Sequence, residues 1–352
     1  MFITGLGTAL PPRRYTQQEC WQALETWDQV RKLAPRSRAI LRKVLLGDNG
    51  IDARHLALDS MTEAFTLTPD VTHARFARHA PNLAAEAAEN ALRSAGLDAS
   101  AIDGVIVSTC TGYLCPGLTS YVSERLGLRA DAVALDLVGL GCGAALPNLR
   151  TGEALITAGQ CRRVLSICVE VCSAALYLDD DPGVLISACL FGDGAGAAVL
   201  SAEASDSFRR IEWKQTATLL DPQSRDLLCF EQRGGLLRNI LTPAVPGLAA
   251  KHAATVFRDV TEGANVNRTE ISQWIFHAGG RDVLTALQRQ FELNETDLEG
   301  SAATLRNIGN VSSLFVYFVL ERALKRAATG GRWWLSSFGA GFSCHGALLE
   351  VE

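Results

Sequence analysis

Cys142 is the residue of this chain best placed for covalent chemistry. It lies between two glycines, where a short apolar run (132–138) gives way to an alanine-rich segment with helical spacing (144–158). Pro147 is tolerated only in the first turn of a helix, so we expect the helix to begin close to Cys142. The free N–H groups and the positive dipole of a helix start favour the thiolate, the nucleophilic form. The glycines would let a substrate approach the backbone, and the Cys142 amide would then face a developing oxyanion. A buried structural cysteine is the commoner alternative.

Two more polar residues lie where such a cysteine would need partners. His277 ends an expected strand (271–277) and precedes a glycine turn, a position where α/β folds place their sites. An imidazolium there would hold the cysteine as a thiolate in an ion pair, although a lone histidine on an apolar strand is more often structural. Asn310 precedes an apolar helix expected over 312–326. Local sequence favours a helix cap for Asn310, and the alternative is an amide donor to a carbonyl that becomes an enolate.

Composition excludes several classes of function. The chain has 352 residues, 48% hydrophobic and 20% charged, and a formal net charge of −5. No basic surface therefore indicates binding to nucleic acid or to an anionic membrane. We find no signal peptide and no apolar run long enough to span a bilayer, so a cytoplasmic location is expected. The cysteines form no Cys-x-x-Cys pair and no cluster at zinc spacing, so neither a metal site nor a disulfide framework is expected.

The order of the expected elements predicts a duplicated α/β fold with a mainly parallel or mixed sheet. Strands are expected at 2–7, 103–109, 133–138, 163–171, 194–201, 211–217, 271–277 and 332–337, with helices between most of them. Two similar glycine-rich stretches, at 191–194 and 338–341, lie near the ends of the two parts of this pattern. We therefore expect two related halves, residues 1–201 with the cysteine and residues 202–352 with the histidine and the asparagine.

Four stretches together resemble one family. They are Gly-Leu-Gly-Cys-Gly-Ala-Ala around Cys142, Trp-Ile-Phe-His-Ala-Gly-Gly at 274–280, Gly-Asn-Val-Ser-Ser at 309–313 and the ending Phe-Gly-Ala-Gly at 338–341. In this order they resemble the type III polyketide synthases, the chalcone-synthase-like branch of the thiolase superfamily. The resemblance runs from Phe2 to the C-terminus. It implies a thiolase fold, a duplicated αβαβα architecture of five layers.

The resemblance also implies a mechanism with Cys142, His277 and Asn310 as catalytic residues. Cys142 would take an acyl group from a CoA starter as a thioester. Malonyl-CoA would lose carbon dioxide to give an enolate held by His277 and Asn310, and the enolate would attack the thioester. The extended chain would return to the cysteine or cyclise. Acyl-CoA and malonyl-CoA are then substrates, no cofactor is expected, and a homodimer is implied because Cys115 matches a residue that reaches the partner's cavity.

Substrate-pocket positions follow from the same resemblance. Phe191 matches the first of two gatekeeper phenylalanines between the CoA tunnel and the catalytic cavity. The second gatekeeper position is occupied by Asn239, and Phe230 lies too far upstream in the sequence to replace it. A polar side chain at this point argues against an aromatic starter and leaves room for another acyl group. Small residues at several further matched positions indicate a roomy cavity: Cys110, Cys172, Ala175 and Ser312.

Departures from the family pattern leave two alternatives open. Ala278 and Ala340 stand where the family usually has proline, and the ending 338–343 also resembles ketoacyl-acyl-carrier-protein synthase III, a sister family. The first alternative is therefore a single-condensation enzyme that receives its substrate from an acyl carrier protein. The second is a catalytically silent thiolase-fold protein that only binds acyl groups or a sister subunit. The presence of all three catalytic residue types counts against the second.

Overall fold

The computed structural model describes all residues from 1 to 352. The main sheet has nine strands: β1 (Phe2–Ala9), β4 (Gly104–Thr109), β5 (Val133–Val138), β6 (Arg163–Glu170), β7 (Gly194–Ser201), β8 (Ile211–Leu220), β11 (Ile271–Phe276), β12 (Gly331–Gly339) and β13 (Ser343–Val351). Two strand pairs lie outside it: β2 (Arg14–Thr16) with β3 (Ala53–His55), and β9 (Leu228–Arg233) with β10 (Leu236–Leu241).

Eleven α-helices connect these strands: α1 (Gln17–Thr26), α2 (Asp28–Lys32), α3 (Pro35–Leu46), α4 (Pro69–Ala95), α5 (Leu118–Leu126), α6 (Ala145–Thr157), α7 (Pro182–Leu190), α8 (Val245–Ala264), α9 (Arg281–Phe291), α10 (Glu295–Ile308) and α11 (Phe315–Lys325). Short 3₁₀ helices near the site are η1 (Met61–Phe65), η3 (Gly141–Gly143), η4 (Cys172–Ala175) and η7 (Ser312–Leu314). None of the helices combines the length and the hydropathy that a membrane crossing needs.

The main sheet consists of two groups of strands joined at one point. Its order is β11-β12-β13-β8-β1-β7-β6-β4-β5. β1 pairs along most of its length with β7, but it meets β8 only through Phe2 and Ile3. β4 is parallel to both β5 and β6, and β11 is parallel to β12, whereas the other pairs are antiparallel. The mixed sheet predicted from the sequence is therefore correct.

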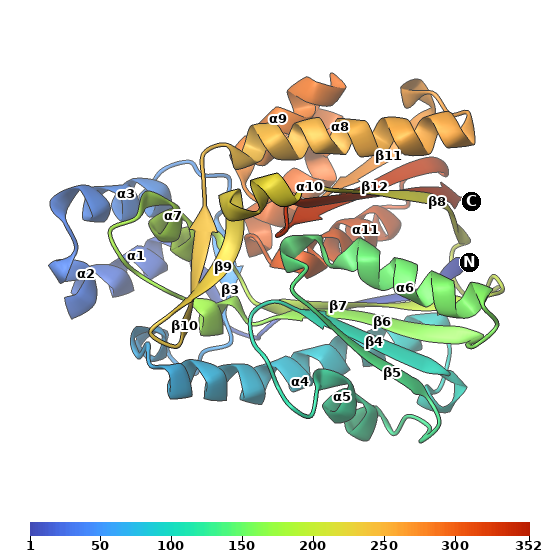
Figure 1. Ribbon diagram of the computed structural model, residues 1–352, viewed down its shortest axis with the longest axis horizontal. Coiled ribbons are helices and arrows are strands. Elements are labelled where there is room, and N and C mark those ends of the chain that lie inside the picture. Colours follow the sequence, from blue (N-terminus) through green and yellow to red (C-terminus); the bar gives the residue numbers. More distant parts are fainter.

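Helices cover both groups of strands and give five layers (Figure 1). α4 contacts β1, β7 and β6 on one outer side, where α5 also packs on β4 and β5. α8 contacts β8 and β13 on the opposite outer side, beside α9. Between the two groups lie α6 and α11, and each of them contacts strands of both groups. This αβαβα arrangement is the predicted thiolase fold.

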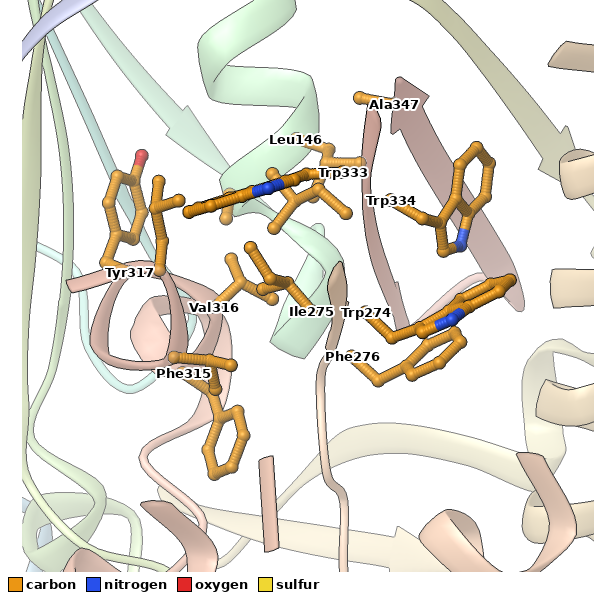
Figure 2. Packing of buried hydrophobic residues seen from close by; sticks show 14 of the residues in the cluster. Leu146, Trp274, Ile275, Phe276, Phe315, Val316, Tyr317, Trp333, Trp334 and Ala347 are labelled. Carbon is orange, nitrogen blue, oxygen red and sulfur yellow. The ribbon is translucent and has the colours of Figure 1, made fainter. Parts of the chain in front are cut away.

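Consecutive tryptophans on β12 hold the central layer and an outer layer to the same strand. Trp333 and Trp334 are fully buried. Because successive strand side chains point to opposite faces, Trp333 lies toward Leu146 of α6 while Trp334 lies toward Trp274 (Figure 2). Trp334 also packs edge-on against Phe257 of α8, with ring centroids 4.9 Å apart. The strand that ends beside Cys142 is thereby fixed on both faces.

Glycines at the Cys142 loop let it pack backbone to backbone on the turn between β12 and β13. Gly141 has φ +56°, a left-handed conformation that favours glycine, and a Cβ there would lie 2.8 Å from the amide nitrogen of Ala340. A Cβ on Gly339 would overlap the Gly143 amide and lie 2.5 Å from the Leu140 carbonyl oxygen. The glycines thus admit another segment of the chain, not the substrate approach expected from the sequence.

Gly339→Ala tests this contact. The added methyl group must displace the 140–143 loop, so the free energy of unfolding should fall by about 1–3 kcal/mol, as for other overpacked sites. Urea denaturation followed by circular dichroism measures the change. Gly247→Ala in α8 is the control, because no atom lies within 4 Å of its added Cβ, and it should be neutral or slightly stabilising. Equal stability of the two variants would contradict the packing argument.

Candidate active site

Cys142 lies in η3, directly before α6, as the helix start predicted from the sequence requires. Its Sγ accepts a hydrogen bond from Ser312 Oγ at 3.2 Å. Burial raises the pKa of the Cys142 thiol to about 12, although the Ser312 hydroxyl opposes this shift. This direction argues against the thiolate that the helix start favours, so a protonated thiol is the form expected in the ligand-free protein.

His277 follows β11 and is 1% exposed. Its backbone N–H donates to the Ser336 carbonyl of β12 at 2.9 Å, which fixes the loop to the sheet. The imidazole packs edge-on against Phe315 and Phe338, at centroid distances of 5.4 and 5.1 Å. Neither ring nitrogen has a hydrogen-bond partner, and burial lowers the pKa of His277 to about 3. The ring is therefore neutral and has unused hydrogen-bonding capacity.

These two pKa directions argue against the imidazolium–thiolate pair expected from the sequence. Such a pair needs a Cys142 pKa below that of His277, and burial moves the two in opposite senses. The structure also records no hydrogen bond between the two side chains; Cys142 Sγ is bonded to Ser312 instead. A neutral thiol and a neutral imidazole are the resting forms.

Asn310 connects the His277 loop to the Cys142 region. Its Nδ2 donates to the Gly279 carbonyl at 3.0 Å, and its Oδ1 accepts from the Ser312 amide at 2.9 Å. The second bond satisfies the start of η7, so the cap-like role favoured by local sequence is present. An amide group carries two N–H hydrogens, and the Gly279 bond uses one of them. The capping bond and a donor role are therefore compatible.

Ser312 holds a strained backbone at the centre of these contacts. It has φ +55° and is 1% exposed, an unusual combination for a residue other than glycine. The conformation lets its amide reach Asn310 while its hydroxyl reaches Cys142. Ser312 thus joins Cys142 to Asn310, and Asn310 in turn is bonded to the His277 loop at Gly279.

Glu170 is a buried acid that the sequence analysis missed. Its carboxylate accepts bonds from the Cys110 amide at 3.0 Å, from Thr111 Oγ1 at 2.9 Å and from Ser313 Oγ at 2.6 Å. Ser312 Oγ lies 3.5 Å from the same carboxylate. Burial raises the pKa of this carboxyl group. The signal was available, because Glu170 is the one acid in a mostly apolar strand and stands at its carboxyl end.

A single cavity brings together most of the pocket residues expected from the sequence. It encloses about 910 Å³ with its open mouth, and Cys142 lies in its wall. The other expected residues that line it are Cys172, Ala175, Phe191, Asn239 and Ser312. The remaining expected residues, which do not line it, are Cys110, Cys115, His277 and Asn310. Cys110 contacts Ser312 Oγ at 3.7 Å, whereas Cys115 is exposed.

Phe230 corrects one conclusion from the sequence. Judged by sequence distance, it is too far from Asn239 to share its position. The β9–β10 hairpin, which the sequence analysis did not anticipate, makes these two residues direct cross-strand partners, and both line the cavity. Asn239 is also 8% exposed, and its Oδ1 lies 2.9 Å from Ser187 Oγ of α7. An aromatic ring is therefore present beside Asn239 after all.

No group of three or more His, Cys, Asp or Glu side chains is arranged to hold a metal ion. Neutral N–H donors near a thiol suit reactions in which negative charge develops on a thioester oxygen.

Comparisons with known proteins agree with this arrangement. Residues 5–204 match the N-terminal domain of the chalcone and stilbene synthases, and residues 220–351 match their C-terminal domain. The chain is 32% identical to 1,3,6,8-tetrahydroxynaphthalene synthase of Streptomyces peucetius subsp. caesius, over 99% of this chain and 92% of that protein. It is 30% identical to phloroglucinol synthase of Pseudomonas fluorescens, over 97% and 96%.

A solved structure gives the same answer for the fold. PKS-I from the brown alga Ectocarpus siliculosus superposes with a TM-score of 0.90 at 25% identity, covering 99% of this chain and 98% of that chain. The family domains, the relatives and the fold agree over nearly the whole sequence. The chain therefore belongs to the chalcone and stilbene synthase family and is a type III polyketide synthase, a condensing enzyme that uses CoA thioesters.

Proposed function

We propose that this chain condenses an acyl-CoA starter with malonyl-CoA, with Cys142 as nucleophile and with His277 and Asn310 as donors to the enolate. One observation carries the assignment. The imidazole of His277 is buried with both ring nitrogens unpartnered, in a loop that Asn310 ties to the Cys142 side of the cavity. A buried polar group without a partner is costly, so its retention indicates a partner that arrives with the substrate.

Loading of the starter is the first step. The Cys142 thiol gives its proton to the neutral imidazole of His277, and the Ser312 hydroxyl, 3.2 Å from Sγ, stabilises the thiolate. The sulfur attacks the thioester carbon of the acyl-CoA. CoA leaves as a thiolate and takes the proton back from His277. Because the imidazole is neutral at rest, a ring nitrogen has a free lone pair for this proton, and interactions with the bound substrate must offset the low pKa of His277 and the raised pKa of the thiol.

Condensation is the second step. The C–C bond to the carboxylate of malonyl-CoA breaks, carbon dioxide leaves, and the electron pair moves to the thioester oxygen as an enolate. An N–H of His277 and the second amide hydrogen of Asn310 donate to that oxygen. The enolate carbon then attacks the thioester on Cys142 and expels the cysteine thiolate. Covalent attachment of the starter makes this step effectively intramolecular.

A homodimer is the proposed assembly. β5 is the edge strand of the main sheet, and along it half-buried residues alternate with exposed ones, ending at Val138, which is 59% exposed. Such an edge pairs readily with another strand. Cys115 is also exposed, as a residue directed at a partner subunit would be in one isolated chain.

The expected cytoplasmic location stays a prediction.

The two alternatives have different requirements: the single-condensation enzyme needs an acyl carrier protein, and the silent acyl-binding protein needs no nucleophile. Purified protein supplied with acyl-CoA and malonyl-CoA alone should release carbon dioxide and form an extended product, measured by liquid chromatography with mass spectrometry. Product that forms only after an acyl carrier protein is added would favour the single-condensation alternative. Unchanged product from Cys142→Ala would favour the silent acyl-binding protein.

Asn310→Asp tests the donor role of Asn310. The aspartate keeps the oxygen that accepts from the Ser312 amide, but it loses both amide hydrogens, the one bonded to the Gly279 carbonyl and the one proposed for the enolate, and it adds negative charge beside the enolate. Release of carbon dioxide should fall about 100- to 1,000-fold. Acylation of Cys142, followed by intact-protein mass, should be nearly unchanged. Equal loss of both steps would show that Asn310 only supports the fold.

The pH dependence of Cys142 alkylation tests the neutral resting pair. The thiolate is the reactive form, and its pKa is raised, so the rate with iodoacetamide should climb about tenfold per pH unit from about pH 7 to about pH 9. Peptide mass spectrometry follows Cys142 separately from the other cysteines. A rate that is independent of pH below about pH 8, and that His277→Ala abolishes, would instead establish an ion pair.

A further inference from the structure

We propose that the starter is an unbranched apolar acyl chain whose thioester lies at Cys142 and whose tail lies in the far end of the same cavity, between α1 and η1. This inference rests on the proposed function, because it names the class of acyl group that Cys142 accepts. It concerns a part of the cavity that none of the proposed catalytic residues touches.

The far end of the cavity is built from the segment 17–65. Cys20 and Leu24 of α1 face it from one side, and Met61, Ala64 and Phe65 of η1 also line it. Cys20 is 2% exposed and Leu24 is 9% exposed, so the α1 side is closed to solvent, whereas Met61 and Phe65 on the η1 side are partly exposed. Because this region and Cys142 line one continuous cavity, a chain attached to the sulfur has an apolar space to enter.

Three hydroxyl groups in the wall are already bonded within the protein, whereas Arg54 Nε is buried there without a partner. Thr111 Oγ1 donates to Glu170 at 2.9 Å, Ser173 Oγ donates to Asp193 at 2.6 Å, and Ser187 Oγ donates to the Gly183 carbonyl at 2.8 Å. Of the 23 lining residues, 17 are hydrophobic. A starter with polar groups along its length would lose hydrogen bonds to water when it is buried here, whereas an alkyl chain has no hydrogen bonds to lose.

Arg54 is the one charged residue in the wall of the cavity. It makes a second malonyl group the rival starter, because a guanidinium would pair with the carboxylate of that group. Its Nη1 donates to the carbonyls of Ala188 and Phe191, at 2.8 and 3.0 Å, at the end of α7. These bonds commit the guanidinium to holding α7. A starter carboxylate would need the remaining N–H groups of this single side chain to offset its burial in an otherwise apolar cavity. The apolar acyl chain is therefore the better fit.

A homologous series of starters tests the proposal on the full-length protein. Acetyl-, butyryl-, hexanoyl-, octanoyl-, decanoyl- and dodecanoyl-CoA are each supplied with malonyl-CoA, and kcat/KM is measured together with the mass of acylated Cys142. Each buried methylene should raise kcat/KM about fourfold until the cavity is full. A flat or falling series, or a preference for malonyl-CoA as starter, would overturn the proposal. Absence of condensation with every starter would instead overturn the proposed function.

Two variants test whether the acyl tail of the starter lies in the far end of the cavity. Leu24→Ala should move the preferred starter to a longer chain, and Ala64→Phe should move it to a shorter one. Leu45→Ala is the matched control, because Leu45 packs in the same small core as Leu24 but does not line the cavity. It should lose similar stability and keep the wild-type preference. If Ala64→Phe does not fold, the comparison of Leu24→Ala with Leu45→Ala decides; an identical chain preference in these two would exclude this location.

Discussion

The backbone contact between the Cys142 loop and the β12–β13 turn is the constraint on which the site depends. Gly141, Gly143 and Gly339 leave no space for side chains between the two segments. The proposed nucleophile, Cys142, comes from the first half of the chain, and His277 and Asn310 come from the second, so this contact fixes one group relative to the other. Trp333 and Trp334 then hold β12 against two layers of helices. Glycines that look like a flexible loop in the sequence are thus part of a rigid joint.

Burial sets the chemical state of the site. Burial raises the pKa of the partly buried Cys142 thiol and lowers the pKa of the fully buried His277 imidazole, and both directions favour the neutral forms. The same exclusion of water strengthens any hydrogen bond to an enolate oxygen and protects a reactive intermediate from hydrolysis. A protein that kept the ion pair permanently would need charged neighbours, and His277 is flanked instead by the phenyl rings of Phe315 and Phe338.

The family and the five-layer fold could be predicted from the sequence alone, because both are indicated by short motifs that tolerate few residue types. The proposed catalytic residues come from the same motifs. Glu170 was missed because its role arises from residues distant in sequence, Cys110 and Ser313, that meet only in the folded chain. The Phe230 conclusion failed for a related reason: sequence distance does not reveal the register of a hairpin. The pKa directions depend on total burial, which no local pattern reports. The boundary between residues 201 and 202 stays a prediction.

The β9–β10 hairpin has a consequence for how this enzyme diversifies. It pairs only with itself and belongs to no layer of the main sheet. Yet it contributes both Phe230 and Asn239 to the cavity wall. Exchanges at these two positions would therefore change the wall of the cavity without altering any strand of the main sheet.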